Sequence, residues 1–216
     1  ITPRQARRIF EDKNWCRVMG FHTRNVPHRV HEFIQLKAFE KYYCDGLFIH
    51  PLVGPKKQGD FKEKTILESY EPVIKKYYPK NRVLLAAFQS FPYYAGPNEA
   101  VFTAICRKNF GCSHFIVGRD HSGVGEYYEK DAAHRLFDEL GPIGIEPVYF
   151  NEHGYHPSSQ TYKDITKEKL EDFFMISGNK AREMLQKKEL PPQWFMRPEV
   201  SKLIIDKIEN GEDVFT

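Results

Sequence analysis

The residue types best suited to binding anions are concentrated in the stretch FHTRNVPHRVHE, residues 21–32. Arg24 can donate two parallel hydrogen bonds to a phosphate or a sulfate. His28 and His31 are three residues apart, so they share one face of the helix that Pro27 is expected to begin. The backbone amides in the first turn of that helix would add an anion site of their own. We therefore interpret this stretch as one that surrounds an anion.

Two other interpretations of this stretch stay open. Histidines and arginines at the start of a helix also occur on ordinary solvated surfaces. The H-x-x-H pair formed by His28 and His31 could instead bind a metal, although no further His, Cys or carboxylate lies at a suggestive local spacing. We predict no protein-bound metal.

A second stretch that could take part in chemistry is GRDHSGVG, residues 118–125, which directly follows the apolar run SHFIV. Three glycines in eight residues allow the backbone to approach a ligand closely. The stretch is not a Walker A loop, because no G-K-[ST] follows, and it is not G-x-G-x-x-G either. Alone it could be only a turn, but together with residues 21–32 it favours a nucleotide-binding crevice.

Alternating strands and helices are expected to position both stretches. Apolar runs predict strands at residues 15–21, 46–54, 82–88, 113–118 and 145–150. Helical patterns occur at residues 3–13, 27–43, 61–78, 96–111 and 131–141. This alternation predicts an α/β fold with a parallel sheet covered by helices on both faces. Ligands bind such sheets beyond the carboxyl ends of the strands, where both stretches lie.

The character of the sequence changes after residue 150, where the polar segment NEHGYHPSSQTYKD precedes two short helical segments. We therefore predict two parts. Residues 1–150 would form the catalytic α/β domain, and residues 151–216 would form a small, mainly helical C-terminal subdomain.

The 216-residue chain has an ordinary globular composition, with 41% hydrophobic and 28% charged residues. Its net charge of +3, from 32 basic and 29 acidic residues, argues against a nucleic-acid partner. No apolar run approaches the ~20 residues of a membrane span and no secretory signal opens the chain, so no membrane partner is expected. Cys16, Cys44, Cys106 and Cys112 form no C-x-x-C pair and suggest free thiols in the reducing cytoplasm. A start at Ile1 instead of Met suggests a piece of a longer protein.

Taken together, these segments resemble the ATP sulfurylase (sulfate adenylyltransferase) family. HTRNVPHRVH, residues 22–31, is similar to the family's first signature, and GRDHSG, residues 118–123, is similar to its second. HPLVGPKKQGD, YAGPNEA and AICRKNFGCSHFIVG resemble the family segments between them, in the same order. ISGNKAR and LPPQWFMRPEV resemble segments near the family's end. The likeness covers nearly the whole chain.

The resemblance implies a Rossmann-like nucleotidylyltransferase domain that converts ATP and sulfate into adenosine 5′-phosphosulfate and pyrophosphate. It also implies Mg²⁺ that accompanies ATP as substrate, a role in sulfate assimilation, and a homo-oligomer in the full-length protein. The family's upstream N-terminal domain would be absent from this chain.

Matching the motifs residue by residue gives each matched residue an expected role. The catalytic residues would be Thr23, Arg24, Asn25, His28 and His31. ATP would be bound by His22, Thr23, Arg24, Asn25, Gly118, Arg119, Asp120, His121 and His153. Sulfate would be bound by His22, Arg24 and the backbone amide of Ser122. Sulfate carries its own negative charge, so no general base or covalent nucleophile is expected.

Several residues depart from the family's pattern. His22 replaces a Gln that donates an amide hydrogen to sulfate, whereas a neutral imidazole donates from one nitrogen only and can gain a charge. Tyr93 and Asn98 stand where Arg is frequent, and Ser122 replaces Ala. Two alternatives therefore stay open: an adenylyltransferase for another oxyanion, and a catalytically silent nucleotide-binding module. The residues kept in both signatures argue against the silent module.

Overall fold

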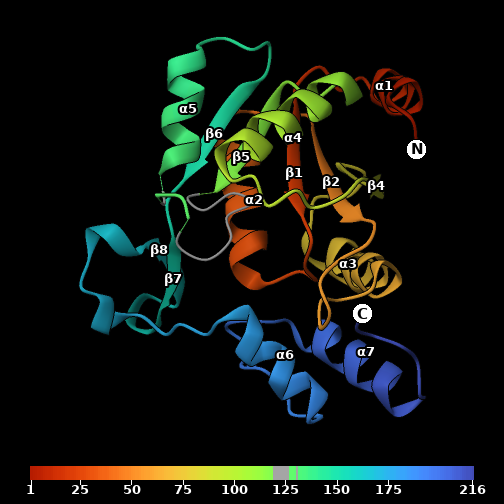
Figure 1. Ribbon diagram of the computed structural model, residues 1–216, viewed down its shortest axis with the longest axis vertical. Coiled ribbons are helices and arrows are strands. Elements are labelled where there is room, and N and C mark those ends of the chain that lie inside the picture. Colours follow the sequence, from red (N-terminus) through yellow and green to blue (C-terminus); the bar gives the residue numbers. More distant parts are fainter. Residues whose placement is uncertain (119–126, 130) are drawn as a thin grey trace.

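The computed structural model has at its centre a parallel β-sheet with helices on both faces (Figure 1). It describes residues 1–118, 127–129 and 131–216. The strands of this sheet are β1 (Val18–Thr23), β2 (Gly46–Val53), β3 (Val83–Leu85), β4 (Phe88–Gln89), β5 (His114–Gly118) and β6 (Glu146–Phe150). The helices beside it are α1 (Pro3–Asp12), α2 (Arg29–Lys41), α3 (Glu63–Tyr77), α4 (Pro97–Phe110) and α5 (Ala132–Leu140). The predicted α/β class is confirmed.

The order of the strands, β3-β2-β1-β5-β6 with β4 also beside β2, places β1 in the middle of the sheet. From β1 the chain moves through α2 to β2 and through α3 to β3, all on one side. It then returns to the other side, where β5 pairs with β1 and β6 pairs with β5, both in parallel. The direction of winding therefore reverses between β1 and β5, and open α/β sheets bind ligands at such a point.

Alternate residues of the strands supply two hydrophobic cores, one on each face of the sheet. In β2, Leu47 and Ile49 belong to the core that packs against α2 and α3. Phe48 and Leu52 belong to the other core, which packs against α1, α4 and α5. Every residue of β2 is buried, as expected for an interior strand with both faces covered.

The chain after residue 150 forms an antiparallel hairpin and two further helices. The hairpin pairs β7 (His153–His156) with β8 (Thr161–Asp164) and was not predicted from the sequence. α6 (Gly178–Gln186) and α7 (Pro198–Glu209) lie below α2 and α3 in Figure 1 and extend the core on that face. Residues from both sides of residue 150 contribute to that core. The division into 1–150 and 151–216 therefore stays a proposal that rests on the change in sequence composition.

The strand predicted at residues 82–88 is divided into β3 and β4, which both pair with β2. Between them, Ala86 still donates its backbone N–H to the Ile49 carbonyl at 3.1 Å. The Ala87 carbonyl lies 3.3 Å from Nε2 of the buried His50. The strand is thus interrupted at Ala87, where the backbone carbonyl contacts the buried side chain of His50 and not the backbone of a neighbouring strand.

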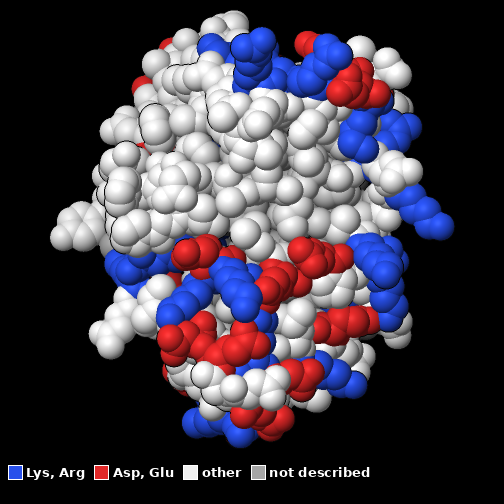
Figure 2. Space-filling model, turned by 90° about the vertical axis from the view of Figure 1, so that its right-hand side faces the viewer, with Lys and Arg blue, Asp and Glu red and all other residues white. Residues whose placement is uncertain are grey.

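Figure 2 shows the face on the right of Figure 1, where an uncharged band separates two charged regions. Basic side chains dominate above the band. Below it, over α3 and α7, positive and negative side chains are interleaved, and Lys207 of α7 lies 2.6 Å from Glu68 of α3. Among the described residues, no helix is both long and apolar enough to cross a membrane.

Candidate active site

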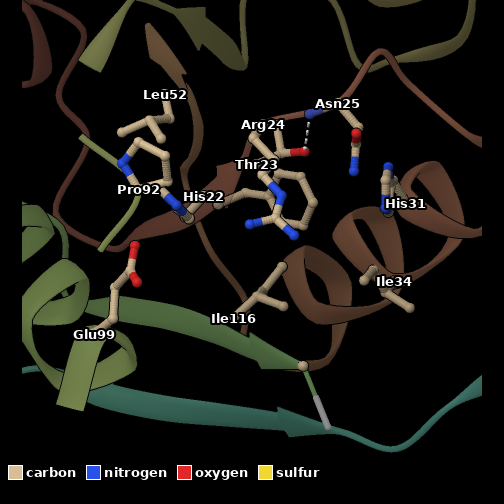
Figure 3. A pocket seen from close by; sticks show the side chains of 12 residues that line it. His22, Thr23, Arg24, Asn25, His31, Ile34, Leu52, Pro92, Glu99 and Ile116 are labelled. Atoms are coloured by element: carbon tan, nitrogen blue, oxygen red, sulfur yellow. Dashed lines mark hydrogen bonds between the residues drawn. The ribbon is translucent and has the colours of Figure 1, made fainter. Parts of the chain in front are cut away.

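A cavity of about 240 Å³ opens at the carboxyl ends of β1 and β5, where the winding of the sheet reverses (Figure 3). Segments from α2, β2 and α4 complete its wall. The lining residues are Phe21, His22, Thr23, Arg24, Asn25, His31, Ile34, Leu52, Pro92, Glu99, Ile116 and Gly118. The structure therefore brings together most of the described residues that the sequence analysis assigned to the site.

The residues at the end of β1 supply most of the polar groups of the cavity. Thr23 is buried, and its Oγ1 accepts a hydrogen bond of 3.1 Å from the backbone N–H of Asn25, drawn as a dashed line in Figure 3. The guanidinium of Arg24 lies 5.1 Å from the centre of the Tyr94 ring. Lys57 contacts the same ring at 4.4 Å, so two cations flank one aromatic side chain beside the cavity.

His28 and His31 form a stacked pair at the start of α2. The helix begins at Arg29 with His28 as its N-cap, two residues later than the predicted start at Pro27. The two imidazole rings are nearly parallel, with 4.9 Å between their centroids. The backbone N–H of His28 donates to Nδ1 of His31 at 3.4 Å. His31 lines the cavity, whereas His28 also packs against the ring of Phe195, 4.4 Å away.

Burial keeps both histidines neutral. It lowers the pKa of His31 to about 4. The pKa of His28 is lowered well below its ordinary value by burial first, then by the repulsion that arises when the adjacent His31 is also protonated, and by the charge of Arg182. Because Nδ1 of His31 already accepts a hydrogen bond, the ring proton is assigned to Nε2. His31 can therefore donate a hydrogen bond to an anion without carrying a charge itself.

Arg107, which contacts His22, was missed by the sequence analysis. It lies on α4 and is fully buried, and its Nη2 is 2.7 Å from Nδ1 of His22 and 2.8 Å from the His50 carbonyl. Burial lowers the pKa of Arg107 to about 10, so its guanidinium stays charged at neutral pH. The sequence did hold a signal, because Ala100 and Ala104 precede Arg107 on one apolar helix face, where a charged residue is unusual.

Glu99 is a second lining residue that the sequence analysis did not expect. It is buried in the first turn of α4, and its Oε2 accepts a hydrogen bond of 3.1 Å from the backbone N–H of Ala95. Figure 3 shows its carboxylate on the side of the cavity formed by His22 and Pro92. Within the described part of the chain, no three or more His, Cys, Asp or Glu side chains are grouped to hold a metal ion.

Only the first residue of the second predicted stretch can be placed. Gly118 ends β5 and lines the cavity, in a strand that runs beside β1. Four further predicted residues lie outside the described residues: Arg119, Asp120, His121 and Ser122.

His153 is not among the residues that line this cavity. It lies on β7 and lines a second cavity of about 70 Å³ together with Val30 and Tyr155. The rings of Phe33 and Phe150 are each 5.7 Å from its imidazole. An aromatic side chain in such a setting suits stacking against a planar ligand, but also suits an ordinary aromatic cluster.

Comparison with known proteins matches this chain to one protein family. The family model described as ATP-sulfurylase matches residues 1–207. A sulfate adenylyltransferase from Staphylothermus marinus is 47% identical over 207 residues, which are 95% of this chain and 54% of that protein. One from a Synechococcus strain is 44% identical over 98% of this chain and 55% of its own length. The chain thus spans about half the length of these relatives.

Solved structures agree on the fold. A hexameric APS kinase from Thiobacillus denitrificans superimposes with a TM-score of 0.75 at 22% identity, over 96% of this chain and 39% of that one. A nicotinic acid mononucleotide adenylyltransferase from Plasmodium falciparum, complexed with NaAD, gives a TM-score of 0.55 at 11% identity, over 91% and 98%. At these identities the likeness establishes a shared Rossmann-like fold and nothing further.

Proposed function

The chain belongs to the ATP-sulfurylase family, and on this premise we propose that it is the catalytic part of a sulfate adenylyltransferase. The reaction would join sulfate to the α-phosphate of ATP and release pyrophosphate, giving adenosine 5′-phosphosulfate. One observation carries the proposal: His22, Arg24, Asn25 and His31 meet in a cavity at the point where the winding of the sheet reverses. Groups of this kind bind oxyanions, and both the substrate sulfate and the transferred phosphate are oxyanions.

The chemistry asks the protein for position and for charge stabilisation. An oxygen of sulfate attacks the α-phosphorus, and the bond to the bridging oxygen breaks, so that pyrophosphate leaves with the electron pair. Sulfate is a weak nucleophile, so holding it in line with that bond is the larger part of the task. Arg24 and His22 would hold the sulfate, while His28, His31 and the start of α2 would stabilise charge on the leaving pyrophosphate.

The remaining predicted residues complete the proposed substrate site. Thr23 and Asn25 would shape the turn that carries Arg24, in line with the hydrogen bond between them. We propose that the nucleotide is bound by Gly118, Arg119, Asp120 and His121, with His153 near the adenine, and that the backbone amide of Ser122 adds a donor to sulfate.

Two neutral histidines suit a site that is alternately empty and filled with highly charged phosphates. Burying two imidazolium ions in the empty site would be costly, and the lowered pKa values of His28 and His31 avoid that cost. A pyrophosphate group nearby would favour their charged forms, because an opposite charge raises the pKa of an imidazole. The charge on the histidines would then appear together with the charge that they stabilise.

Mg²⁺ is proposed to enter with ATP. Glu99 is the single carboxylate among the described residues that line the cavity, and it already accepts a backbone N–H. Mg²⁺ commonly takes one or two carboxylates together with phosphate oxygens and water, so the donors described here fit an ion held mainly by the phosphates. When bound, it would reduce the negative charge of the triphosphate.

The reverse reaction gives the sharpest test. The 216-residue chain is supplied with adenosine 5′-phosphosulfate, pyrophosphate and Mg²⁺, and ATP is measured by luciferase luminescence. Robust ATP formation, lost in Arg24→Ala, supports the proposal. Binding of ATP without turnover, under every oxyanion tried, would instead indicate the silent nucleotide-binding module.

An adenylyltransferase for another oxyanion is the second candidate, and His22 is the observation that favours it. Tyr93 and Asn98 give it less support, because neither lines the cavity, and Tyr93 is exposed with its ring 5.7 Å from that of Phe102. Pyrophosphate release from MgATP with molybdate, selenate or phosphate but not with sulfate would select this candidate. We also propose that the full-length protein is a homo-oligomer, that it is located in the cytoplasm, and that it serves sulfate assimilation.

A further inference from the structure

The contact between Arg107 and His22 restricts which ring nitrogen of His22 carries a proton. Nη2 of Arg107 lies 2.7 Å from Nδ1 of His22. A guanidinium has donors only and keeps its proton at any ordinary pH. Because two N–H groups cannot form a hydrogen bond with each other, Nδ1 must be the acceptor in this pair. The single proton of a neutral His22 is then left for Nε2.

Arg107 has little freedom to move away from this contact. Its Nη2 also donates to the His50 carbonyl at 2.8 Å, and its guanidinium carbon lies 4.0 Å from the centre of the Phe88 ring. Gly20 of β1 makes room for the arginine stem, because a Cβ on Gly20 would come within 3.1 Å of Cγ of Arg107. The side chain is therefore held between β1, β2 and β4, with its charged end directed at His22.

No carboxylate partner accompanies this buried cation among the described residues, and its Nε also has no hydrogen-bond partner there. An unpaired buried charge is costly, and an anion in the adjoining cavity would reduce that cost. Other described groups near His22 include the edge of the Phe88 ring, 6.3 Å away, and the charged side chains of Arg24 and Glu99, which line the same cavity.

We propose that Arg107 is a positioning residue that holds His22 in the neutral tautomer with Nδ1 as acceptor and Nε2–H as donor, so that His22 offers the substrate oxyanion one fixed hydrogen bond. This inference rests on the proposed function for the identity of the oxyanion. It also gives His22 the behaviour of an amide side chain, with an acceptor facing the protein and a donor on the opposite side. Oxyanion binding through His22 would then not vary as the pH passes through the ordinary range of histidine titration.

Nuclear magnetic resonance of the intact chain, labelled with ¹⁵N-histidine, tests the tautomer directly and without any activity. His22 is assigned by the signal that disappears in His22→Gln. We expect an unprotonated Nδ1 and a protonated Nε2, unchanged between about pH 8 and about pH 6. A protonated Nδ1, or an imidazolium that appears with a midpoint near 6.5, would overturn the proposal. Failure of the sulfurylase reaction would leave this readout untouched, so the two failures can be told apart.

Two variants of neighbouring residues on α4 test the consequence for sulfate binding. Arg107→Met removes the donor to His22, and Lys108→Met on the same helix is its matched control, because Lys108 donates instead to the Ile143 carbonyl at 2.8 Å. In Arg107→Met we expect His22 to titrate and the KM for sulfate to rise on the order of tenfold with a new pH dependence, as for a lost hydrogen bond to a charged group. Lys108→Met should behave like the parent protein.

A double variant separates the tautomer effect from a simple loss of positive charge. Glutamine cannot titrate, so Arg107→Met in the His22→Gln background should raise the KM for sulfate without any pH dependence. The same pH dependence in both backgrounds would contradict the proposal. If Arg107→Met does not fold, the tautomer measured in the parent protein decides the question.

Discussion

The burial of His31 leads to a specific prediction about how the free energy of unfolding depends on pH. The substitution is His31→Gln, which removes the titrating group at the third position of α2. Glutamine is a normal residue at this position of a capped helix, where its side-chain oxygen can accept the N–H of His28 as Nδ1 of His31 now does. The variant therefore keeps the cap and loses only the ability to bind a proton.

The magnitude follows from the lowered pKa of His31. Burial lowers it from the ordinary value of 6.5 to about 4, so the unfolded chain binds a proton at a pH where the folded protein does not. Protonation of the unfolded chain pulls the equilibrium towards unfolding as pH falls below 6.5, and the effect is complete near the folded pKa. At about 1.36 kcal/mol for each pKa unit, the titration of His31 should lower the free energy of unfolding by about 3 kcal/mol between neutral pH and about pH 4.

Urea unfolding, followed at a series of pH values, measures the effect. The free energies of unfolding of the two proteins should differ little near pH 8, and the variant should become relatively more stable by about 3 kcal/mol as pH approaches 4. His28 and His50 also have a lowered pKa, but both proteins contain them, so their contribution largely cancels in the comparison. Parallel curves over the whole range would show that His31 is not held neutral by burial, and the reasoning about the empty site would fail with it.

Three further predictions concern catalysis and stability. His28→Ala should lower kcat in the ATP-forming assay by about 100-fold, as for removal of one donor to a developing anion, with an unchanged circular dichroism spectrum; unchanged turnover would remove the role proposed for His28. Glu32→Ala leaves the partly buried Arg197, which lies 2.9 Å from Glu32 in the parent protein, without its partner, and should lower the free energy of unfolding in urea by about 2 kcal/mol. Arg197→Met in the same chain should recover part of that loss. Gly46→Ala would place a Cβ 2.1 Å from the buried Trp15 ring and should cost about 2 kcal/mol with an unchanged m-value, whereas a neutral result would mean that the ring can move aside.

Local patterns in the sequence were enough to predict the sheet and its helices. The apolar runs became β1, β2, β5 and β6, of which the interior strands β1, β2 and β5 contribute residues to the cores on both faces, while the edge strand β6 exposes Glu146 and Tyr149. The helices between the strands give the parallel crossovers. The residues 22–25 were placed correctly at a strand end, because a strand that stops at Thr23 must deliver the next residues to the edge of the sheet. These features depend on short-range patterning, which a single sequence contains.

The features that were missed depend on contacts between distant segments. The break between β3 and β4 involves His50, a side chain from the neighbouring strand. The burial of Arg107 depends on the space beside Gly20 and on acceptors from β1 and β2, so its charge suggested an exposed residue until those neighbours were known. The neutral state of His31 likewise follows from burial, which local sequence does not reveal.

The start of α2 is held by the far end of the chain. The backbone N–H of Arg29 donates to the Phe195 carbonyl at 2.8 Å, and the Phe195 ring packs on His28. Glu32 pairs with Arg197, 165 residues away in sequence. During synthesis from the N-terminus, the segment around Phe195 and Arg197 emerges from the ribosome about 165 residues after the start of α2. The nascent chain would thus acquire a competent anion site only after this distant segment has been made.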